Sequence, residues 1–266
     1  MADDLRCHVI ESIAQAGSGH PGGSLSSADI VALLYGHVLE IRPDDTHWSN
    51  RDRFVLAKGH AAPLLYAALA MRDFFEPSEL SSLRKLGSRL QGHPDCKSTP
   101  GVEASTGSLG QGLSIGVGMA LAGQMDDGEW GVYVLLGDGE LQEGQVWEAA
   151  MAAAHYKLAN LVAIIDYNGL QIDGPIREVL SPEPLDDKWR AFGWYVQEVD
   201  GHDFCQLDQA IRNAQSASLP AVIIAHTIKG KGVDFMEGEC DWHGKAPSME
   251  QCHDALQQIR GQKGAL

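Results

Sequence analysis

Two oxygen-bearing side chains follow two apolar runs of the sequence and could together hold a divalent cation. Asp138 stands between two glycines directly after residues 132–136, and Asn168 follows residues 161–165, thirty positions after Asp138. Mg²⁺ prefers hard oxygen ligands and usually shares them with phosphate groups, and Ca²⁺ or Mn²⁺ accepts similar ligands. The Asp138 carboxylate, the Asn168 amide oxygen and the backbone carbonyl of Leu170 are therefore candidate metal ligands. The glycines beside Asp138 allow the backbone to approach a diphosphate closely.

This pairing has a second interpretation that involves no ligand. Asp138 could cap the helix that follows it, and Asn168-Gly169 could form an ordinary turn. A Gly-Asp-Gly sequence alone is weak evidence, because such turns are common. Its pairing with an Asn at this distance resembles the thiamine-diphosphate signature.

Four of the eleven histidines stand in glycine- or proline-rich segments rather than along helical patterns: His20, His60, His93 and His243. Imidazole transfers protons to and from hydroxyl oxygens near neutral pH, and loops commonly carry functional side chains. Each histidine alone could equally be a structural residue. Together they predict a pocket lined by imidazoles.

Six motifs of the chain occur in the order seen in transketolases. They are S-G-H-P-G-G, R-D-R-F-V-L-A-K-G-H-A-A-P-L-L-Y, Q-G-H-P-D, S-T-G-S-L-G-Q-G-L, G-D-G-E-L-Q-E-G and W-H-G-K-A-P. On these motifs nearly the whole chain resembles the N-terminal, diphosphate-binding part of a transketolase. That part makes up a third to a half of a full-length enzyme of this family.

The resemblance implies which residues hold the cofactor thiamine diphosphate. The metal ligands would be Asp138, Asn168 and the carbonyl of Leu170. The cofactor contacts would be His60, Ser26, Gly107, Ser108, Leu109, Asp138, Gly139, Asn168, Lys229 and His243. Lys229 would also supply local positive charge in an acidic chain.

The resemblance also implies the residues that face the sugars. His20, His93 and His243 would contact the substrate hydroxyls and act in catalysis, and Lys245 would help at the mouth of the site. Glu143 matches a glutamate at the family's subunit interface that is linked to the partner's active site. A solvated glutamate at a helix start is its alternative interpretation.

The implied reaction is the reversible transfer of a two-carbon ketol group from a ketose (phosphate) to an aldose (phosphate). The sequence ends before the pyrimidine-binding domain of a full-length enzyme, so we expect a separate C-terminal subunit, most simply in a two-plus-two assembly. Residues that grip the sugar phosphate would lie largely in that partner, so a pentose-phosphate role and a specialised pathway both remain open. Gly23 stands where some relatives carry a hydroxyl side chain near the substrate, which also leaves the donor sugar open.

Three other functions remain to be weighed. One is another thiamine-diphosphate enzyme, similar to 1-deoxyxylulose-5-phosphate synthase or to the α subunit of a 2-oxo acid dehydrogenase. Another is a non-catalytic paralogue that binds a partner. The third, a histidine-rich metallohydrolase, lacks the close histidine spacing of a helical ligand pair.

Short apolar runs that alternate with helical patterns predict how these residues are positioned. We expect short buried strands at residues 53–56, 131–136, 161–165, 194–199 and 221–225. Helices are expected near residues 5–14, 27–38, 61–71, 107–124, 144–155, 206–215 and 249–259, with residues 17–24 as a break. This order predicts one α/β domain over residues 1–266, in which a mainly parallel sheet is covered on both faces. Residues 226–266 would form a tail with a site loop and the last helix.

Two further patterns have structural interpretations. Asp203 follows a predicted strand and precedes a helix, so we expect it to be an N-cap. The aromatic residues Trp189, Phe192, Trp194 and Tyr195 are expected to pack in the core.

Composition limits the possible partners and the compartment. The 266 residues carry a formal net charge of −16, which disfavours nucleic acid and anionic membranes as partners. The five cysteines form no paired motif, and the N-terminus shows no secretory signal. No apolar stretch reaches the length of a membrane span. These features predict a cytoplasmic protein.

Overall fold

A computed structural model describes residues 1–263 and shows five parallel strands in one sheet, in the order β1-β2-β3-β7-β6. The strands are β1 (Arg53–Leu56), β2 (Val132–Gly137), β3 (Leu161–Tyr167), β6 (Tyr195–Asp200) and β7 (Ala221–His226). All four neighbouring pairs run in parallel. This arrangement confirms the predicted sheet.

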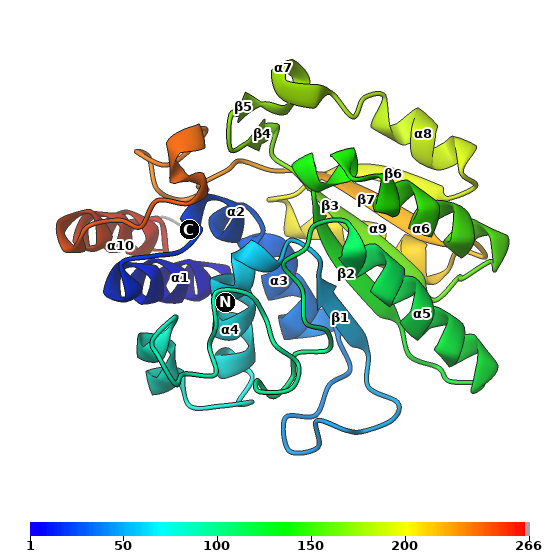
Figure 1. The fold of residues 1–266 in the computed structure, drawn as a ribbon, viewed down its shortest axis with the longest axis horizontal. Coiled ribbons are helices and arrows are strands. Elements are labelled where there is room, and N and C mark those ends of the chain that lie inside the picture. The colour runs from blue at the N-terminus through cyan, green and yellow to red at the C-terminus, as the bar shows by residue number, and fades with distance from the viewer. Residues whose placement is uncertain (264–266) are drawn as a thin grey trace.

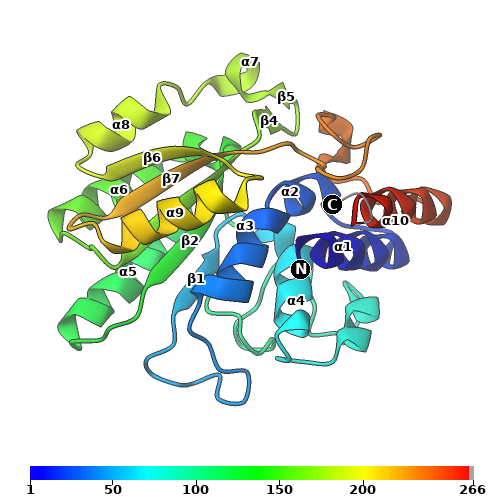
Figure 2. The same ribbon diagram turned by 180° about the vertical axis from the view of Figure 1, so that it is seen from behind.

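Helices cover both faces of this sheet, which gives three layers (Figure 1). Successive strand residues alternate between two hydrophobic cores: Tyr133 and Leu135 face one core, and Val132 and Val134 face the other. The first core includes residues of α1, α3, α4 and α9, and Figure 2 shows α3 and α9 from that side. The second core includes residues of α5, α6 and α8. Both faces of each central strand are buried, as its continuous apolar sequence predicts.

The ten α-helices that the structure assigns within residues 1–263 match most of the predicted ones. Two further elements, β4 (Leu170–Gln171) and β5 (Gly174–Pro175), form a short antiparallel hairpin that the sequence did not reveal. The helices are α1 (Ala2–Ala16), α2 (Pro21–Ser26), α3 (Ala28–Leu33), α4 (Ala62–Met71), α5 (Gln111–Met125), α6 (Gly144–His155), α7 (Ile176–Leu180), α8 (Leu185–Ala191), α9 (Phe204–Gln215) and α10 (Met249–Lys263).

Two predictions about local structure were wrong. Residues 17–24 are not only a break, because Pro21 begins the short buried helix α2. Tertiary packing requires the glycine at position 22, because a Cβ there would lie 2.9 Å from the carbonyl oxygen of Trp242. Strand β6 is not buried, because it forms the edge of the sheet and its side chains are exposed or half-buried.

The two structural interpretations hold with one exception. Asp203 caps α9, since its side chain accepts hydrogen bonds from the backbone N–H groups of Cys205 and Gln206. Trp189 and Trp194 are buried in the second core, and Phe192 packs against it. Tyr195, in contrast, is exposed at the sheet edge.

Three strands deliver the predicted site residues to one edge. β2, β3 and β7 end side by side, with Gly137 paired to Asp166 and Asp166 paired to Ala225. Asp138, Asn168 and Thr227 therefore follow at the same carboxyl edge, where open parallel sheets bind ligands. No helix within residues 1–263 has the length and apolar character needed to cross a bilayer.

Candidate active site

A pocket of about 310 Å³ opens at this edge and brings most of the predicted site residues together. Segments from the whole length of the chain contribute to its wall. The predicted residues that line it are His20, His60, His93, Gly107, Leu109, Asp138, Gly139, Glu143, Asn168, Leu170, Lys229 and His243.

Three predicted site residues lie outside the pocket wall. Ser26 is fully buried behind it and donates a hydrogen bond to Asp166. Ser108 is exposed next to the lining residues Gly107 and Leu109. The ammonium of Lys245 lies 5.0 Å from the ring centre of Trp242, with its side chain at the surface.

The three predicted metal ligands lie in adjacent turns. Asp138 Oδ1 accepts a hydrogen bond from Gly139 N at 2.8 Å, and Oδ2 accepts one from Gly169 N at 2.6 Å. Asn168 Oδ1 accepts from Leu170 N at 3.1 Å. Asp138 thus caps the short 3₁₀ helix Gly139–Gln142, as its alternative interpretation proposed, and also links the ends of β2 and β3.

The chemistry of these groups fits a hard divalent cation. Asp138 is buried, and this burial together with the nearby Asp166 carboxylate raises its pKa to about 7. A cation at the turn would favour the ionised carboxylate. Carboxylate, amide and carbonyl oxygens are the donors that Mg²⁺, Ca²⁺ and Mn²⁺ prefer.

Three imidazoles form a second compact group in the wall of the same pocket. The ring centres of His20, His60 and His243 lie 5.1–5.5 Å from one another. Burial is the main reason that the pKa of His20 and that of His243 fall to about 4, and it lowers the pKa of His60 well below its usual value. All three rings are therefore neutral at pH 7.

Lys229 connects the two groups. Its ammonium lies 3.3 Å from the carbonyl oxygen of Leu170 and 3.0 Å from Nδ1 of His243. Because an ammonium can only donate, Nδ1 of His243 accepts and the proton of the neutral ring is assigned to Nε2. Burial lowers the pKa of Lys229, and the Asp138 carboxylate opposes that shift.

Gly107 and His93 fit closely against each other. Gly107 has a φ of +140°, and a Cβ there would lie 2.8 Å from the His93 ring. Only glycine combines this backbone conformation with this approach. The ring of His93 has a lowered pKa, because it is partly buried and lies near Arg84.

Sequence reasoning missed four charged residues around the pocket. Glu140 is buried and accepts hydrogen bonds from the backbone N–H groups of Gly110 and Gly137. It thereby connects the segment of predicted cofactor contacts at residues 107–109 to the end of β2. Lys58 and Asp166 form a buried ion pair, and Arg84 lowers the pKa of His20 and His93. Glu140 and Lys58 belong to the family motifs quoted above, and this membership was the signal that could have identified them as site residues.

Glu143 lies at the rim of the pocket. It is the N-cap residue of α6 and has an exposed side chain. Both its interfacial interpretation and its solvated interpretation are compatible with this position.

The fold and the site define a diphosphate-binding α/β domain of the thiamine-diphosphate class. The family model described as "Transketolase, thiamine diphosphate binding domain" matches residues 1–264. The chain therefore belongs to the transketolase family.

Relatives that are themselves subunits match the chain over nearly their whole length. The 6-deoxy-6-sulfo-D-fructose transketolase subunit of Clostridium sp. (strain MSTE9) is 45% identical, over 97% of this chain and 94% of its own. An apulose-4-phosphate transketolase subunit of Phocaeicola vulgatus is 44% identical, over 96% of this chain and 90% of its own.

Single-chain relatives match only in part. The crystal structure of transketolase from Campylobacter jejuni superimposes with a TM-score of 0.93 at 35% identity, over 97% of this chain but 42% of that enzyme. The chain thus corresponds to less than half of a full-length transketolase, and these enzymes share its fold.

Proposed function

We propose that this chain is the N-terminal subunit of a two-chain transketolase. It transfers a two-carbon ketol group reversibly from a ketose (phosphate) to an aldose (phosphate), and it works only with a C-terminal subunit. The observation that carries the proposal is one pocket in which the oxygen ligands at the ends of β2 and β3 face a group of neutral imidazoles. Family membership supports the same reaction.

Thiamine diphosphate, when bound, supplies the carbon centre that accepts and releases the two-carbon fragment. The chain's own residues bind and orient its diphosphate. Asp138, Asn168 and the Leu170 carbonyl would hold Mg²⁺ or a similar cation, whose charge would help to balance that of the diphosphate. Lys229 would add positive charge at the same end of the pocket.

The imidazoles would handle the protons of the sugar hydroxyls. His20 and His243 are neutral at pH 7, so each ring can accept a proton at one nitrogen and donate at the other. His93 would bind a further hydroxyl, and His60 would contact the cofactor. Lys245 would help at the mouth of the site, where its ammonium lies 5.0 Å from the ring centre of Trp242.

A partner chain would complete the pocket. Support comes from the subunit relatives, which match in full, and from single-chain enzymes, of which this chain covers 42%. A second chain with the pyrimidine-binding domain would bring the remaining part of the site, most simply as two copies of each chain. Glu143, on the rim, is the candidate contact with that partner. The acidic charge and scattered cysteines favour a cytoplasmic location for the complex.

The substrate pair is best sought among several ketoses. The two named subunit relatives act on different sugars, a sulfonated deoxyfructose and apulose 4-phosphate, so relatives with similar identity differ in substrate. A panel should contain both of these and the common pentose phosphates.

Reconstitution with the C-terminal subunit tests the proposal. We expect ketol transfer from a ketose to an aldose by the mixed chains, with no transfer by either chain alone. A pyruvate-plus-aldehyde assay is the control, and activity there instead would favour a 1-deoxyxylulose-5-phosphate synthase or oxo-acid dehydrogenase type. Cofactor binding without turnover on the whole panel would favour a non-catalytic paralogue, and turnover by the single chain would contradict the need for a partner.

A further inference from the structure

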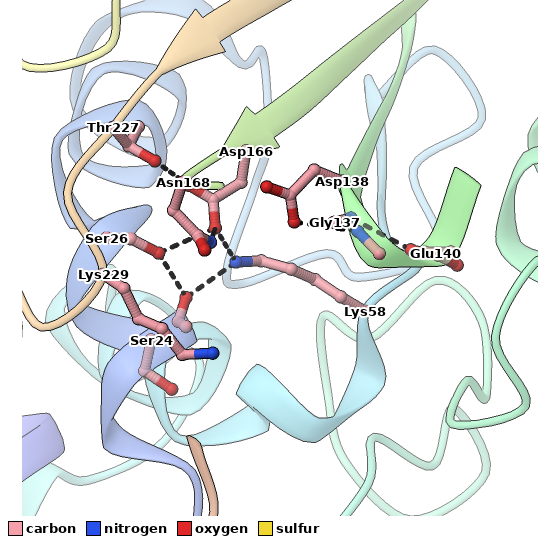
Figure 3. Close-up of polar contacts among 12 residues, drawn as sticks. Ser24, Ser26, Lys58, Gly137, Asp138, Glu140, Asp166, Asn168, Thr227 and Lys229 are labelled. Carbon is pink, nitrogen blue, oxygen red and sulfur yellow. Dashed lines mark hydrogen bonds and ion pairs between the residues drawn. The ribbon is translucent and has the colours of Figure 1, made fainter. Parts of the chain in front are cut away.

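Behind the predicted metal ligands lies a carboxylate that accepts hydrogen bonds from four side chains. Asp166 is fully buried, and its Oδ2 accepts from Lys58 Nζ at 2.6 Å and from Ser26 Oγ at 2.7 Å. Thr227 Oγ1 donates to the other oxygen, Oδ1. Figure 3 shows these donors converging on Asp166 from separate segments.

Lys58 neutralises this carboxylate inside the protein. The lysine side chain is 2% exposed, and its ammonium also donates to the carbonyl oxygen of Gly23 at 2.7 Å. A buried ion pair is tolerated only when both groups are hydrogen-bonded, and loss of one member leaves an uncompensated charge. Asp166 therefore stays ionised and can only accept hydrogen bonds.

The ionised carboxylate has a direct effect on Asn168. The amide nitrogen Nδ2 of Asn168 donates to Asp166 Oδ2 at 3.0 Å, while the amide oxygen Oδ1 accepts from Leu170 N at 3.1 Å. An asparagine can turn its amide over, which would exchange the oxygen and the nitrogen. Both contacts favour the observed orientation, because a turned amide would place its oxygen against the acceptor-only Asp166 and its NH2 group against the Leu170 N–H.

We propose that Asp166, held by Lys58, is a positioning residue that keeps the amide oxygen of Asn168 on the side of the divalent cation. This inference rests on the proposed function, because it deepens the same metal and diphosphate site. Groups that hold a metal ligand in place commonly control metal affinity, and their loss typically costs about 10–100-fold.

Asp166→Asn tests this role, because it keeps the size of the side chain and removes its acceptor-only character. The matched control is Thr227→Val, which removes a donor from the oxygen of Asp166 that does not contact Asn168. Both variants are assembled with thiamine diphosphate and the C-terminal subunit. Free Mn²⁺ is followed by electron paramagnetic resonance, and the apo proteins are compared by thermal unfolding.

We expect Asp166→Asn to weaken Mn²⁺ binding about 10–100-fold and Thr227→Val to change it by less than about threefold. Turnover of Asp166→Asn should recover at saturating Mn²⁺, because the ligand is misoriented rather than lost. A folded Asp166→Asn complex that binds Mn²⁺ as tightly as the wild type would overturn the proposal. Equal losses in both variants would also overturn it, since they would point to a general packing role.

If Asp166→Asn does not fold, the double variant Lys58→Met/Asp166→Asn removes both charges together and is judged by the same criteria. The two proposals fail in different ways. A wild-type complex that transfers a ketol group without any divalent cation would overturn the positioning role and leave the transferase function intact. A wild-type complex that binds Mn²⁺ with the cofactor but transfers nothing would do the reverse.

Discussion

The two sides of the pocket differ in how far the chain itself completes them. We call Lys58, Asp138, Asp166 and Asn168 the strand-tip side, and His20, His60 and His243 the imidazole side. On the strand-tip side the carboxylates are paired with N–H, hydroxyl and ammonium donors of the same chain. On the imidazole side, Nδ1 of His20 is buried without a hydrogen-bond partner among the residues described.

This difference separates binding from chemistry. Hydrogen bonds within the chain hold the strand-tip side chains in place, so this side is suited to bind the proposed cation and diphosphate at little cost in ordering side chains. The imidazole side holds neutral rings, and Nδ1 of His20 has no hydrogen-bond partner among the described residues, which suits groups that must exchange protons with a substrate. The following predictions test that separation.

The largest effect is expected on the strand-tip side. Asp138→Ala combined with Asn168→Ala removes two of the proposed cation ligands. The loss of the cation's charge stabilisation, about several kcal/mol, corresponds to a fall in kcat/KM of about 1,000-fold or more. Thiamine diphosphate retained after gel filtration and turnover of the assembled complex measure it. Asp203→Ala, which alters only the cap of α9, serves as the control. Full retention and full turnover in the double variant would contradict the metal site.

On the imidazole side, His20→Ala should lower kcat about 100- to 10,000-fold, because it removes a proton-transfer group. Mn²⁺ affinity of the complex should stay within about twofold, since His20 touches none of the proposed ligands. The measurements are steady-state kinetics and Mn²⁺ titration on the same preparation. A parallel fall in both quantities would show that the two sides are not separable.

The contact between Gly107 and His93 gives a smaller effect on stability. Gly107→Ala places a Cβ 2.8 Å from the ring at a φ of +140°, so we expect a loss of about 1–3 kcal/mol. Gly118→Ala is the matched control, because Gly118 is an exposed position of α5 with no atom within 4 Å of the added Cβ. That change should stabilise by about 0.5–1 kcal/mol. Urea unfolding of both variants distinguishes the outcomes.

His20 of the imidazole side and Glu140, which lies beside the strand-tip side at the end of β2, should respond to pH in opposite directions. His20 has its pKa lowered to about 4, so its contribution to stability is present above pH 6.5 and is lost as the pH falls towards 4. Glu140 has its pKa raised to about 7, chiefly by burial, so its contribution is present below pH 4.5 and is lost as the pH rises towards 7.

Unfolding of the cation-free protein between pH 4.5 and 6.5 measures these slopes. His20→Gln should make stability rise less with pH than in the wild type, and Glu140→Gln should make it rise more. Each change should amount to about 1 kcal/mol per pH unit or less. His20 is only partly shielded from solvent, and the Glu140 carboxylate accepts hydrogen bonds from backbone N–H groups. Slopes identical to the wild type would contradict the assignment.

Much of the fold and part of the site could be predicted from the sequence. The central strands are short apolar runs with both faces buried, so their composition alone indicates them. Asp138 and Asn168 follow such strands directly, and the pocket does contain both residues. Strand β6 misled the prediction, because an edge strand need not be buried on both faces.

What the sequence could not reveal depends on contacts between distant segments. Lys58 and Asp166 stand 108 residues apart, and nothing local to either residue indicates a buried ion pair. Ser26 matched a cofactor contact in the family, yet α2 turns its hydroxyl towards Asp166 instead of the pocket wall. The strands β4 and β5 have only two residues each, which is too short for an alternating hydrophobic pattern to be detected.

The donors around Asp166 also bear on how the protein matures. They lie 140, 108 and 61 residues away along the chain, and Thr227 follows the last strand of the sheet. Contacts of such long sequence separation form late and slowly in folding. A ribosome-bound chain that stops short of residue 227 would already contain Asp138 and Asn168, yet it would lack Lys229 and His243 of the same pocket. We therefore expect the chain to bind its cofactor only when its synthesis is nearly complete, and not while the earlier part is being made.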